Sequence, residues 1–328
     1  MKKWMKMTAT MMVAAMALTA CGGSTEAPAD EAASGDAYTI GIVQQLEHPA
    51  LDAATQGFED KLTELLGEGN VTFDYQNAQG EQTNCTTIAT KFVSNNVDLI
   101  MANATTALQS AAAATADIPI VGTSVTDYVT AGVADSNDAP GKNVTGASDL
   151  APVDQQIALL LELVPDATKV GIVYCSAEPN SVFQSQLAQA ELDKAGVAWA
   201  EYTAADSNEV QSVVTKAISE CDVLYVPTDN TMANNTEIIK NIAVPAGIPV
   251  IAGEEGICAG CGLATLSISY YDLGVKAAEM AYEILVNGAN PAEMPIEYVS
   301  DGITAKYNPE IAEALGITVP EDMVAIGE

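Results

Sequence analysis

Few residues of this chain have types and spacing that could do chemistry, and they do not form a recognisable catalytic centre. His48 is the only histidine in the chain, and no evident nucleophile stands beside it. Neither a G-x-S-x-G elbow nor a Gly-rich phosphate loop is present. The carboxylates form no acid–base pair of a known kind. The sequence therefore favours ligand binding over catalysis, with His48 either a loop or capping residue before Pro49 or a ligand contact.

Cys258-Ala259-Gly260-Cys261 has the C-x-x-C spacing of redox and zinc sites. Besides Cys21, five cysteines remain, and an odd number does not suit a disulfide framework. No second pair or histidine cluster completes a zinc site. A redox C-x-x-C opens a helix, whereas this one is expected in a Gly-rich turn. We interpret the pair mainly as small-residue packing and leave a local disulfide or a redox or metal function open. No metal or cofactor is predicted.

The charge of the chain limits its partners. The formal net charge is −32, so the basic footprint that a nucleic-acid partner needs is missing. All twelve basic residues are lysines, which excludes the bidentate guanidinium clamp on a carboxylate or phosphate. An anionic group bound here must be held by backbone N–H groups, hydroxyls or lysine.

Strand-like and helix-like segments alternate from residue 38 onward. This order is typical of an α/β fold with parallel, doubly wound sheets. The expected strands are residues 38–43, 71–75, 98–102, 118–123, 169–174, 197–202, 222–227 and 248–252. Helical patterns lie between them, and the first of these helices begins at Pro49.

The order of the segments then repeats, which predicts two similar lobes. Thr39–Val43 corresponds to Lys169–Val173, and Ile118–Val121 corresponds to Ile248–Ile251. The remaining tail cannot form a third domain, so it is expected to cross between the lobes as a hinge of several strands. We expect an N-terminal lobe of residues 38–147 plus 267–293 and a C-terminal lobe of residues 148–266 plus 294–328.

Ligands of parallel sheets bind at the carboxyl ends of the strands, so the loops after the strands are the candidate site. Thr105 and Thr106 begin a helix and could hold a carboxylate through hydroxyls and free N–H groups, or simply cap it. Asp229 could meet an ammonium group, and Glu254 or Glu255 competes for that role. The candidates are Gln44, Glu47, His48, Thr105, Thr106, Thr126 and Asp127 in the first lobe, and Tyr174, Glu178, Asn180, Ser181, Asp229, Asn230 and Glu254 in the second.

The first 37 residues read as targeting and tether sequence. Lys2, Lys3 and Lys6 precede a short apolar run, and Leu18-Thr19-Ala20-Cys21 resembles a bacterial lipobox. We expect residues 1–20 to be a signal peptide, Cys21 to be lipidated and residues 21–37 to be a disordered tether. An ordinary signal peptide with a chance cysteine is the alternative. The signal peptide and the lipobox predict a protein outside the cytoplasm that is anchored to the membrane by lipid. No later stretch looks transmembrane.

Several short motifs resemble those of ABC-transporter substrate-binding lipoproteins of the tryptophan/tyrosine uptake type. The resemblance runs from about Tyr38 to about Tyr282 and rests on Gln44–Asp52, Gln76–Gly80, Val125–Asp127, Asn143–Gly146, Glu178–Ser181 and Pro227–Asn230. It implies the type I periplasmic-binding fold, with two α/β lobes joined by three crossings. It also implies capture of an aromatic amino acid between the lobes by a monomer, without a cofactor, and delivery to a permease and an ATPase.

The resemblance implies that Thr105 and Thr106 help to hold the ligand carboxylate and that Asp229 and Asn230 meet its amino group. The resemblance does not identify the residues that line the pocket for the ligand side chain. Trp199 is expected in a strand away from the cleft. Possible aromatic walls are Tyr128, Phe58, Tyr270 and, best placed, Tyr174.

Three other functions stay open. A sugar- or nucleoside-binding lipoprotein would share the fold, although the missing arginines count against sugars. A receptor that presents its ligand to a sensor would look the same in sequence. A redox lipoprotein using Cys258 and Cys261 is the enzymatic alternative.

Overall fold

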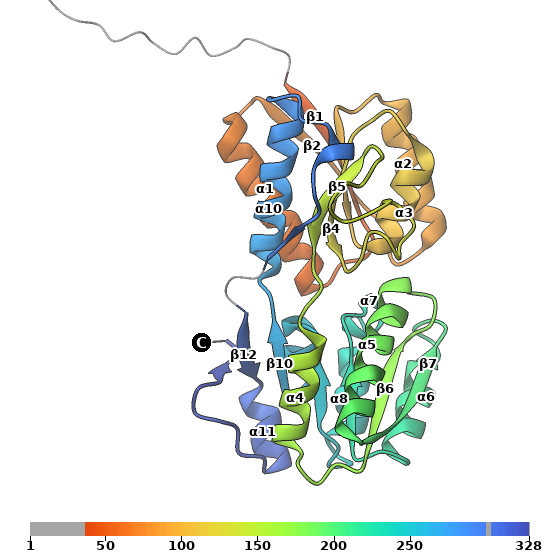
Figure 1. Ribbon diagram of the computed structural model, residues 1–328, viewed down its shortest axis with the longest axis vertical. Coiled ribbons are helices and arrows are strands. Elements are labelled where there is room, and N and C mark those ends of the chain that lie inside the picture. Colours follow the sequence, from red (N-terminus) through yellow and green to blue (C-terminus); the bar gives the residue numbers. More distant parts are fainter. Residues whose placement is uncertain (1–36, 300–302, 328) are drawn as a thin grey trace, which may run out of the picture. The chain divides into compact units, whose positions relative to one another are not determined.

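Two mostly parallel sheets, each covered by helices on both faces, make up the described part of the chain (Figure 1). The structure is a computed structural model that describes residues 37–299 and 303–327. These residues belong to one compact unit. The predicted signal peptide, the lipidation site Cys21 and nearly all of the tether lie outside them. None of the helices in the described ranges is long and apolar enough to cross a bilayer.

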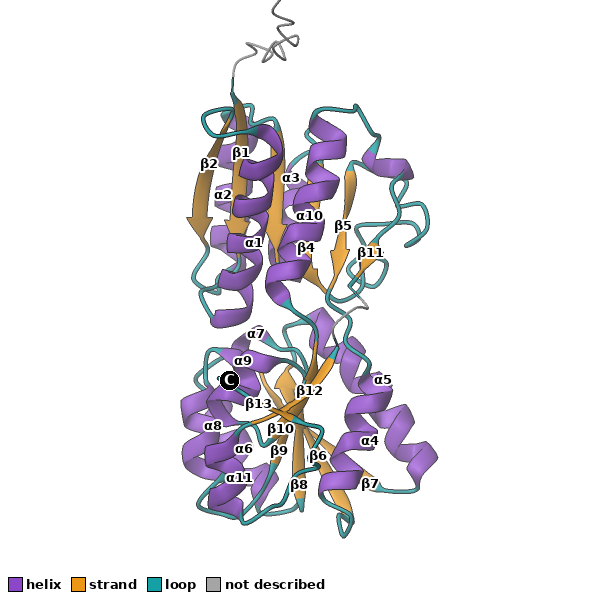
Figure 2. Ribbon diagram, turned by 90° about the vertical axis from the view of Figure 1, so that its left-hand side faces the viewer, coloured by secondary structure: helices purple, strands orange, loops and turns teal. Residues whose placement is uncertain are grey.

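The first sheet has the strand order β11-β5-β4-β3-β1-β2, with every pair parallel. Its elements are β1 (Tyr38–Gln44), α1 (Pro49–Leu66), β2 (Val71–Asn77), α2 (Gln82–Ser94), β3 (Leu99–Asn103), α3 (Thr105–Ala114), β4 (Ile120–Val125), β5 (Val144–Ser148), α10 (Tyr270–Leu285), η1 (Pro291–Glu293) and β11 (Glu297–Tyr298). Helices α1 and α10 lie on one face of the sheet, and α2 and α3 lie on the other (Figures 1 and 2).

The second sheet has the order β13-β12-β10-β9-β8-β6-β7, and β12 is antiparallel to β10. Its elements are α4 (Val153–Leu163), β6 (Lys169–Cys175), α5 (Pro179–Ala195), β7 (Ala198–Ala204), α6 (Val210–Ile218), β8 (Val223–Val226), α7 (Asn230–Ala233), α8 (Thr236–Ala243), β9 (Val250–Ala252), α9 (Glu255–Cys261), β10 (Ala264–Ser267), β12 (Thr304–Tyr307), α11 (Pro309–Leu315) and β13 (Val324–Ala325). The two sheets confirm the predicted α/β class with two doubly wound lobes.

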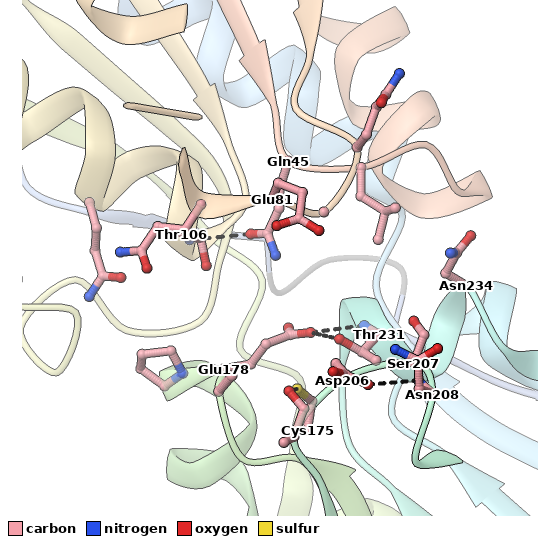
Figure 3. Close-up of a pocket in the computed structure, with 18 residues that line it drawn as sticks. Gln45, Glu81, Thr106, Cys175, Glu178, Asp206, Ser207, Asn208, Thr231 and Asn234 are labelled. Atoms are coloured by element: carbon pink, nitrogen blue, oxygen red, sulfur yellow. Dashed lines mark hydrogen bonds between the residues drawn. The ribbon is translucent and has the colours of Figure 1, made fainter. Parts of the chain in front are cut away.

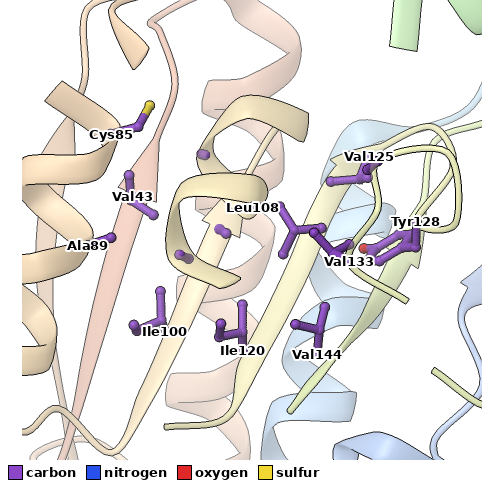
Figure 4. Close-up of a cluster of buried hydrophobic side chains, with 14 of the residues drawn as sticks. Val43, Cys85, Ala89, Ile100, Leu108, Ile120, Val125, Tyr128, Val133 and Val144 are labelled. Carbon is purple, nitrogen blue, oxygen red and sulfur yellow. The ribbon is translucent and has the colours of Figure 1, made fainter. Parts of the chain in front are cut away.

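Each sheet is held by two apolar layers, one on each face. Strands covered on both faces read as continuous apolar runs, because alternate residues enter opposite layers. In the first lobe, Leu108 of α3 packs with Ile100, Ile120 and Val144 of the strands (Figure 4). Burial of each such side chain contributes about 1.5–3 kcal/mol. These layers fix the strand ends, and therefore the loops that follow them.

Three crossings join the lobes, and the predicted boundaries differ from the structure. Ser148 belongs to β5 and Ser267 to β10, each one residue across the expected boundary, and the boundary after residue 293 differs more. The chain leaves the first sheet after β5, returns to it after β10, and leaves it again between β11 and β12. We placed residues 294–328 in the C-terminal lobe, but β11 pairs with β5, Glu297 opposite Ala147 and Tyr298 opposite Ser148. Residues 297–298 therefore belong to the first sheet.

Helix α10 is fixed against α1 by two glycines. A Cβ on Gly274 would come 2.0 Å from the carbonyl oxygen of Ala54, and one on Gly57 would come 2.1 Å from that of Tyr271. Only glycine lets the two backbones approach this closely. Since α10 begins directly after the second crossing, this contact holds the crossing in place.

Candidate ligand-binding site

A small enclosed cavity is lined by residues of both lobes and of two crossings. It has room for about one water molecule. Its lining consists of His48, Leu51 and Ser124 from the first lobe, Asn180, Thr228, Asp229, Asn230, Ala233 and Glu254 from the second, and Asp149 and Tyr270 at the crossings. We call it the central cavity. No lysine is among the described residues that line it.

Two hydrogen bonds join the lobes beside this cavity. Nε2 of His48 lies 3.1 Å from Oδ1 of Asn230, and Nε2 of Gln184 donates to Oγ1 of Thr126 at 3.3 Å. The first links the start of α1 to the start of α7, and the second links α5 to the loop after β4. The two lobes are therefore in direct contact around the cavity.

Glu178 is a structural anchor of the second lobe. Its Oε1 accepts from the backbone N–H and the hydroxyl of Thr231, both at 2.8 Å. Its Oε2 accepts from the backbone N–H of Asn230 and from the side-chain amides of Asn230 and Asn180. Because these donors include the first N–H groups of α7, the carboxylate caps that short helix.

The contacts of Glu178 also fix the proton on His48. Nδ2 of Asn230 donates to Glu178 at 2.7 Å, so Oδ1 of Asn230 is the atom that faces His48. An amide oxygen only accepts, hence Nε2 of His48 carries the proton. Burial lowers the pKa of His48, so the ring is neutral at pH 7. Its Nδ1 is then an acceptor, and this buried atom has no partner within the described residues.

Two further buried polar atoms of the lining have no partner within the described residues, Oδ1 of Asn180 and Oγ of Ser124. Nδ2 of Asn180 already donates to Glu178 and to the carbonyl oxygen of Thr228, so Oδ1 is the free acceptor. Ser124 has φ +54° next to a register shift between β4 and β5. Bulges of this kind re-aim a side chain near functional sites. A buried polar atom without a partner is costly, so three such atoms in one lining indicate a ligand position.

Two of the three carboxylates in the lining are bonded to backbone N–H groups. Asp229 accepts from Cys175 at 2.6 Å and from Met232 at 2.7 Å. Glu254 accepts from the first N–H groups of α9 at Gly256 and Ile257. Burial, with the charge of Glu178, raises the pKa of Asp229 to about 8. Burial raises the pKa of Glu254 to about 7.

Asp149, the third carboxylate, was not predicted from the sequence. It follows β5 and accepts from the hydroxyls of Thr126 and Tyr270, each at 3.0 Å. Burial raises its pKa to about 6. The expected strands did not include Val144–Ser148, so the loop after it was left out of the candidate site. The signal in the sequence was the segment Val144–Ser148, which lies between the expected strand at residues 118–123 and the helix that begins at Val153.

A larger cleft lies beside the central cavity, with a volume of about 470 Å³. Gln45, Thr106, Cys175, Glu178 and Thr231 line parts of it (Figure 3). We call it the outer cleft. The backbone N–H of Thr106 already donates to Oε1 of Gln45 at 3.3 Å, and Thr105 lines neither space. Of the predicted carboxylate site, therefore, only Thr106 lines the outer cleft, and its N–H group is already in use.

The structure divides the other predicted site residues into two groups. His48, Asn180, Asp229, Asn230 and Glu254 line the central cavity, and Thr106 and Glu178 line the outer cleft. The residues that line neither space are Gln44, Glu47, Thr105, Thr126, Asp127, Tyr174 and Ser181. Among these, Gln44 bonds Asp52 and Thr55, Asp127 accepts from the N–H of Thr130, and Glu47 is exposed.

Of the aromatic walls suggested by the sequence, Tyr270 lines the central cavity and Tyr174 does not. Tyr174 packs in the second lobe, and its hydroxyl donates to Glu201 at 2.7 Å. Tyr128 and Phe58 are core residues of the first lobe. Trp199 lies on β7 and donates to Asp193, and it lines neither space.

The C-x-x-C pair lies in α9, so the expected Gly-rich turn is wrong. Cys258 and Cys261 are buried and unbridged, like the other cysteines in the described part of the chain. Burial raises the pKa of both thiols, which leaves them protonated and poorly reactive. No cluster of potential metal ligands occurs within residues 37–299 and 303–327.

Comparison with known proteins places this geometry among solute binders. A curated relative from Clostridioides difficile, named tyrosine-binding protein, is 39% identical over 259 residues, which is 78% of this chain and 75% of the relative. An ABC domain from Streptococcus pneumoniae, solved in complex with L-Trp, has a TM-score of 0.85 and 33% identity over 88% of this chain and 99% of its own. These neighbours confirm the type I periplasmic-binding fold.

A third relative indicates the arrangement of the lobes. The ligand-free, open structure of a Clostridium difficile substrate binding protein with adhesive properties is 40% identical, covering 88% of this chain and 99% of its own, but its TM-score is only 0.69. The chain is thus closer in shape to the L-Trp complex than to a relative of higher identity. With the two hydrogen bonds between the lobes, this indicates a closed arrangement.

The match to the family described as ABC transporter substrate binding protein extends over residues 39–327. It covers both sheets, all three crossings and every residue of the central cavity. The chain belongs to the ABC transporter substrate-binding protein family.

Proposed function

We propose that this protein captures an amino acid, preferably an aromatic one, in the central cavity outside the cytoplasm and presents it to an ABC permease and its ATPase. The observation that carries this proposal is the chemistry of the cavity lining. It combines the carboxylates of Asp149, Asp229 and Glu254 with two unpartnered acceptors, on His48 and Asn180. Such a lining suits a ligand that brings N–H donors and positive charge, as an α-ammonium group does.

The ligand carboxylate also has a partner near the cavity, the start of α1. Helix α1 has no side-chain cap, and Leu51 in its first turn lines the cavity. A helix N-terminus with free N–H groups attracts an anion. The hydroxyl of Ser124 supplies a further donor. This arrangement holds a carboxylate without arginine, in a chain that has none.

The size of the cavity requires the lobes to move. Room for one water molecule cannot accept an amino acid. Separation of the lobes breaks the bonds from His48 to Asn230 and from Gln184 to Thr126. The ligand enters, and its contacts with both lobes then favour the closed state. The names of the two relatives, one tyrosine-binding and one solved with L-Trp, support an aromatic side chain.

A thermal-shift screen tests this proposal. The mature chain is heated with each of the twenty amino acids, with common sugars and with nucleosides. A ligand that binds only the native state raises the melting temperature with concentration. We expect tyrosine, tryptophan or phenylalanine to give the largest increase. If no aromatic amino acid moves the midpoint while a sugar or nucleoside raises it, the proposed ligand class is wrong.

We also propose that Cys21 carries a lipid anchor and that the mature protein is a monomer. The support for the anchor is the Leu18–Cys21 motif with its basic and apolar leader. Mass spectrometry of the protein expressed with its leader should find acyl chains on Cys21, and Cys21→Ser should release the protein from membranes. Light scattering of the soluble chain should give the monomer mass. Co-purification with a permease and an ATPase would separate transport from sensing.

A further inference from the structure

We propose that Asp149 is the residue that binds the ammonium group of the ligand and thereby determines that the ligand must carry a free amine. This inference rests on the proposed function and assigns the charge recognition to one side chain. The sequence pointed instead to Asp229, with Glu254 or Glu255 as the alternative. The three carboxylates of the central cavity differ in the groups to which each is already bonded.

Asp229 and Glu254 both serve as caps of the second lobe. The two oxygens of Asp229 accept from the N–H of Cys175 at the end of β6 and from the N–H of Met232 in α7. The two oxygens of Glu254 accept from the N–H groups of Gly256 and Ile257 at the start of α9. A backbone N–H group cannot rotate towards another acceptor. These two carboxylates are therefore needed as acceptors in the folded protein whether or not a ligand is present. Each oxygen keeps a further acceptor position, but both carboxylates are already held in place, and their charge stabilised, by fixed backbone donors of the second lobe.

Asp149 differs because the donors it receives from other residues are hydroxyls. Thr126 reaches Oδ1 and Tyr270 reaches Oδ2, each at 3.0 Å. An ionised carboxylate has about four acceptor positions, so further positions remain for a ligand. Asp149 is 3% exposed, and an unpaired charge at such a site is unfavourable until a cation arrives.

The unpartnered atoms of the lining point to the same kind of ligand. Nδ1 of His48 and Oδ1 of Asn180 belong to side chains that are 8% and 7% exposed, and both atoms are acceptors. An ammonium group has three N–H donors. One carboxylate and two neutral acceptors match that number and supply the opposite charge.

The position of Asp149 links amine recognition to closure of the lobes. Asp149 lies in the crossing between β5 and α4, and Tyr270 begins α10 just after the crossing from β10. Thr126 receives a hydrogen bond from Gln184 of the second lobe. A cation on Asp149 therefore strengthens a network that includes two crossings and both lobes.

The test is the substitution Asp149→Asn, with calorimetric titration of L-tyrosine, L-tryptophan and 3-(4-hydroxyphenyl)propanoate, which is tyrosine without its amine. In the asparagine, Oδ1 still accepts from one hydroxyl, and the other hydroxyl reverses to accept from Nδ2, so the amide keeps both contacts and the fold. We expect the variant to bind both amino acids at least about 100-fold more weakly, as for loss of one partner of a buried charge pair. Binding of the amine-free analogue, weak in the wild type, should not weaken further.

Asp154→Asn is the matched control, because it replaces a carboxylate by an amide at an exposed position five residues away. Its affinity should equal that of the wild type. If Asp149→Asn does not fold, Asp149→Ser provides a second neutral variant for the same titrations. Equal affinity of the wild type and a folded Asp149 variant for the amino acids overturns this inference alone. Failure of the wild type to bind any amino acid overturns the proposed function, and this inference with it.

Discussion

Replacing Asp149 with asparagine should stabilise the ligand-free protein at neutral pH while it weakens ligand binding at least about 100-fold. The carboxyl group has a pKa raised from 3.8 to about 6 by burial. A carboxyl whose pKa is higher in the folded state binds more protons there than in the unfolded chain. Stability therefore falls as pH rises through the interval between the two values. The ionised group then destabilises the fold at pH 7.

The magnitude follows from the size of that interval. Each pKa unit corresponds to about 1.4 kcal/mol, so the ionised Asp149 costs the fold about 3 kcal/mol above pH 7. Asparagine does not titrate and avoids this cost. The free energy of unfolding of Asp149→Asn should therefore exceed that of the wild type by about 2–3 kcal/mol more at pH 8 than at pH 4.

Urea unfolding of both proteins without ligand, at steps of half a pH unit from 4 to 8, measures this difference. The comparison between the two proteins removes the effect of the net charge, which changes in nearly the same way in both. Most of the difference should develop between pH 4 and 6 and little above pH 7. If the free energies of unfolding of the two proteins change in parallel with pH over the whole range, ionised Asp149 does not destabilise the ligand-free fold.

Three other changes test the site. His48→Ala removes both the hydrogen bond to Asn230 and the Nδ1 acceptor offered to the ligand ammonium, and should weaken ligand binding about 30-fold, as expected for two hydrogen bonds of about 1 kcal/mol each; titration calorimetry measures this, and unchanged affinity would exclude both roles of His48. Glu178→Gln leaves backbone donors of α7 without their charged acceptor and should lower the free energy of unfolding by about 2–3 kcal/mol; urea unfolding checks it, and a loss below about 0.5 kcal/mol would contradict the capping role. Replacing Cys258 and Cys261 by serine should leave ligand affinity unchanged, and the native thiols should react with a thiol reagent only after unfolding; fast reaction of the folded protein would revive the redox alternative.

The fold was largely predictable because its signals are local or periodic. Runs such as Ile40–Val43 and Val170–Val173 enter buried parallel strands, and the prolines at 49 and 179 begin the helices that follow. The repeated order then implied two lobes. The predicted lobe boundary after residue 293 was wrong because β11 has only two residues. So short a strand has no pattern that would assign it to one of the two sheets.

The site was predictable only to the level of loops. Tyr174 and Cys175 are neighbours at the end of β6, and alternate residues of a strand face opposite sides; Cys175 lines the outer cleft, whereas Tyr174 enters the core layer. A sequence does not decide which of two adjacent residues faces the ligand. Asp149 was missed because Val144–Ser148 contains a glycine and polar residues, which weakens the strand signal.

Asp149 and Asp229 differ in their hydrogen-bond partners, and no sequence pattern shows this difference. Both are aspartates in loops that follow strands. Asp229 bonds the N–H of Cys175, 54 residues away, and Asp149 bonds Tyr270, 121 residues away. Only the folded chain shows which carboxylate is held by backbone N–H groups and which is held by other residues through hydroxyls alone.

A crystal structure of the protein grown with the aromatic amino acid that gives the largest thermal shift is the most direct test of the account. We predict that the ligand occupies an enlarged central cavity between the lobes, with its ammonium nitrogen within hydrogen-bond distance of the Asp149 carboxylate. Ligand density in the outer cleft, with the central cavity unchanged and Asp149 bonded only to Thr126 and Tyr270, would contradict it.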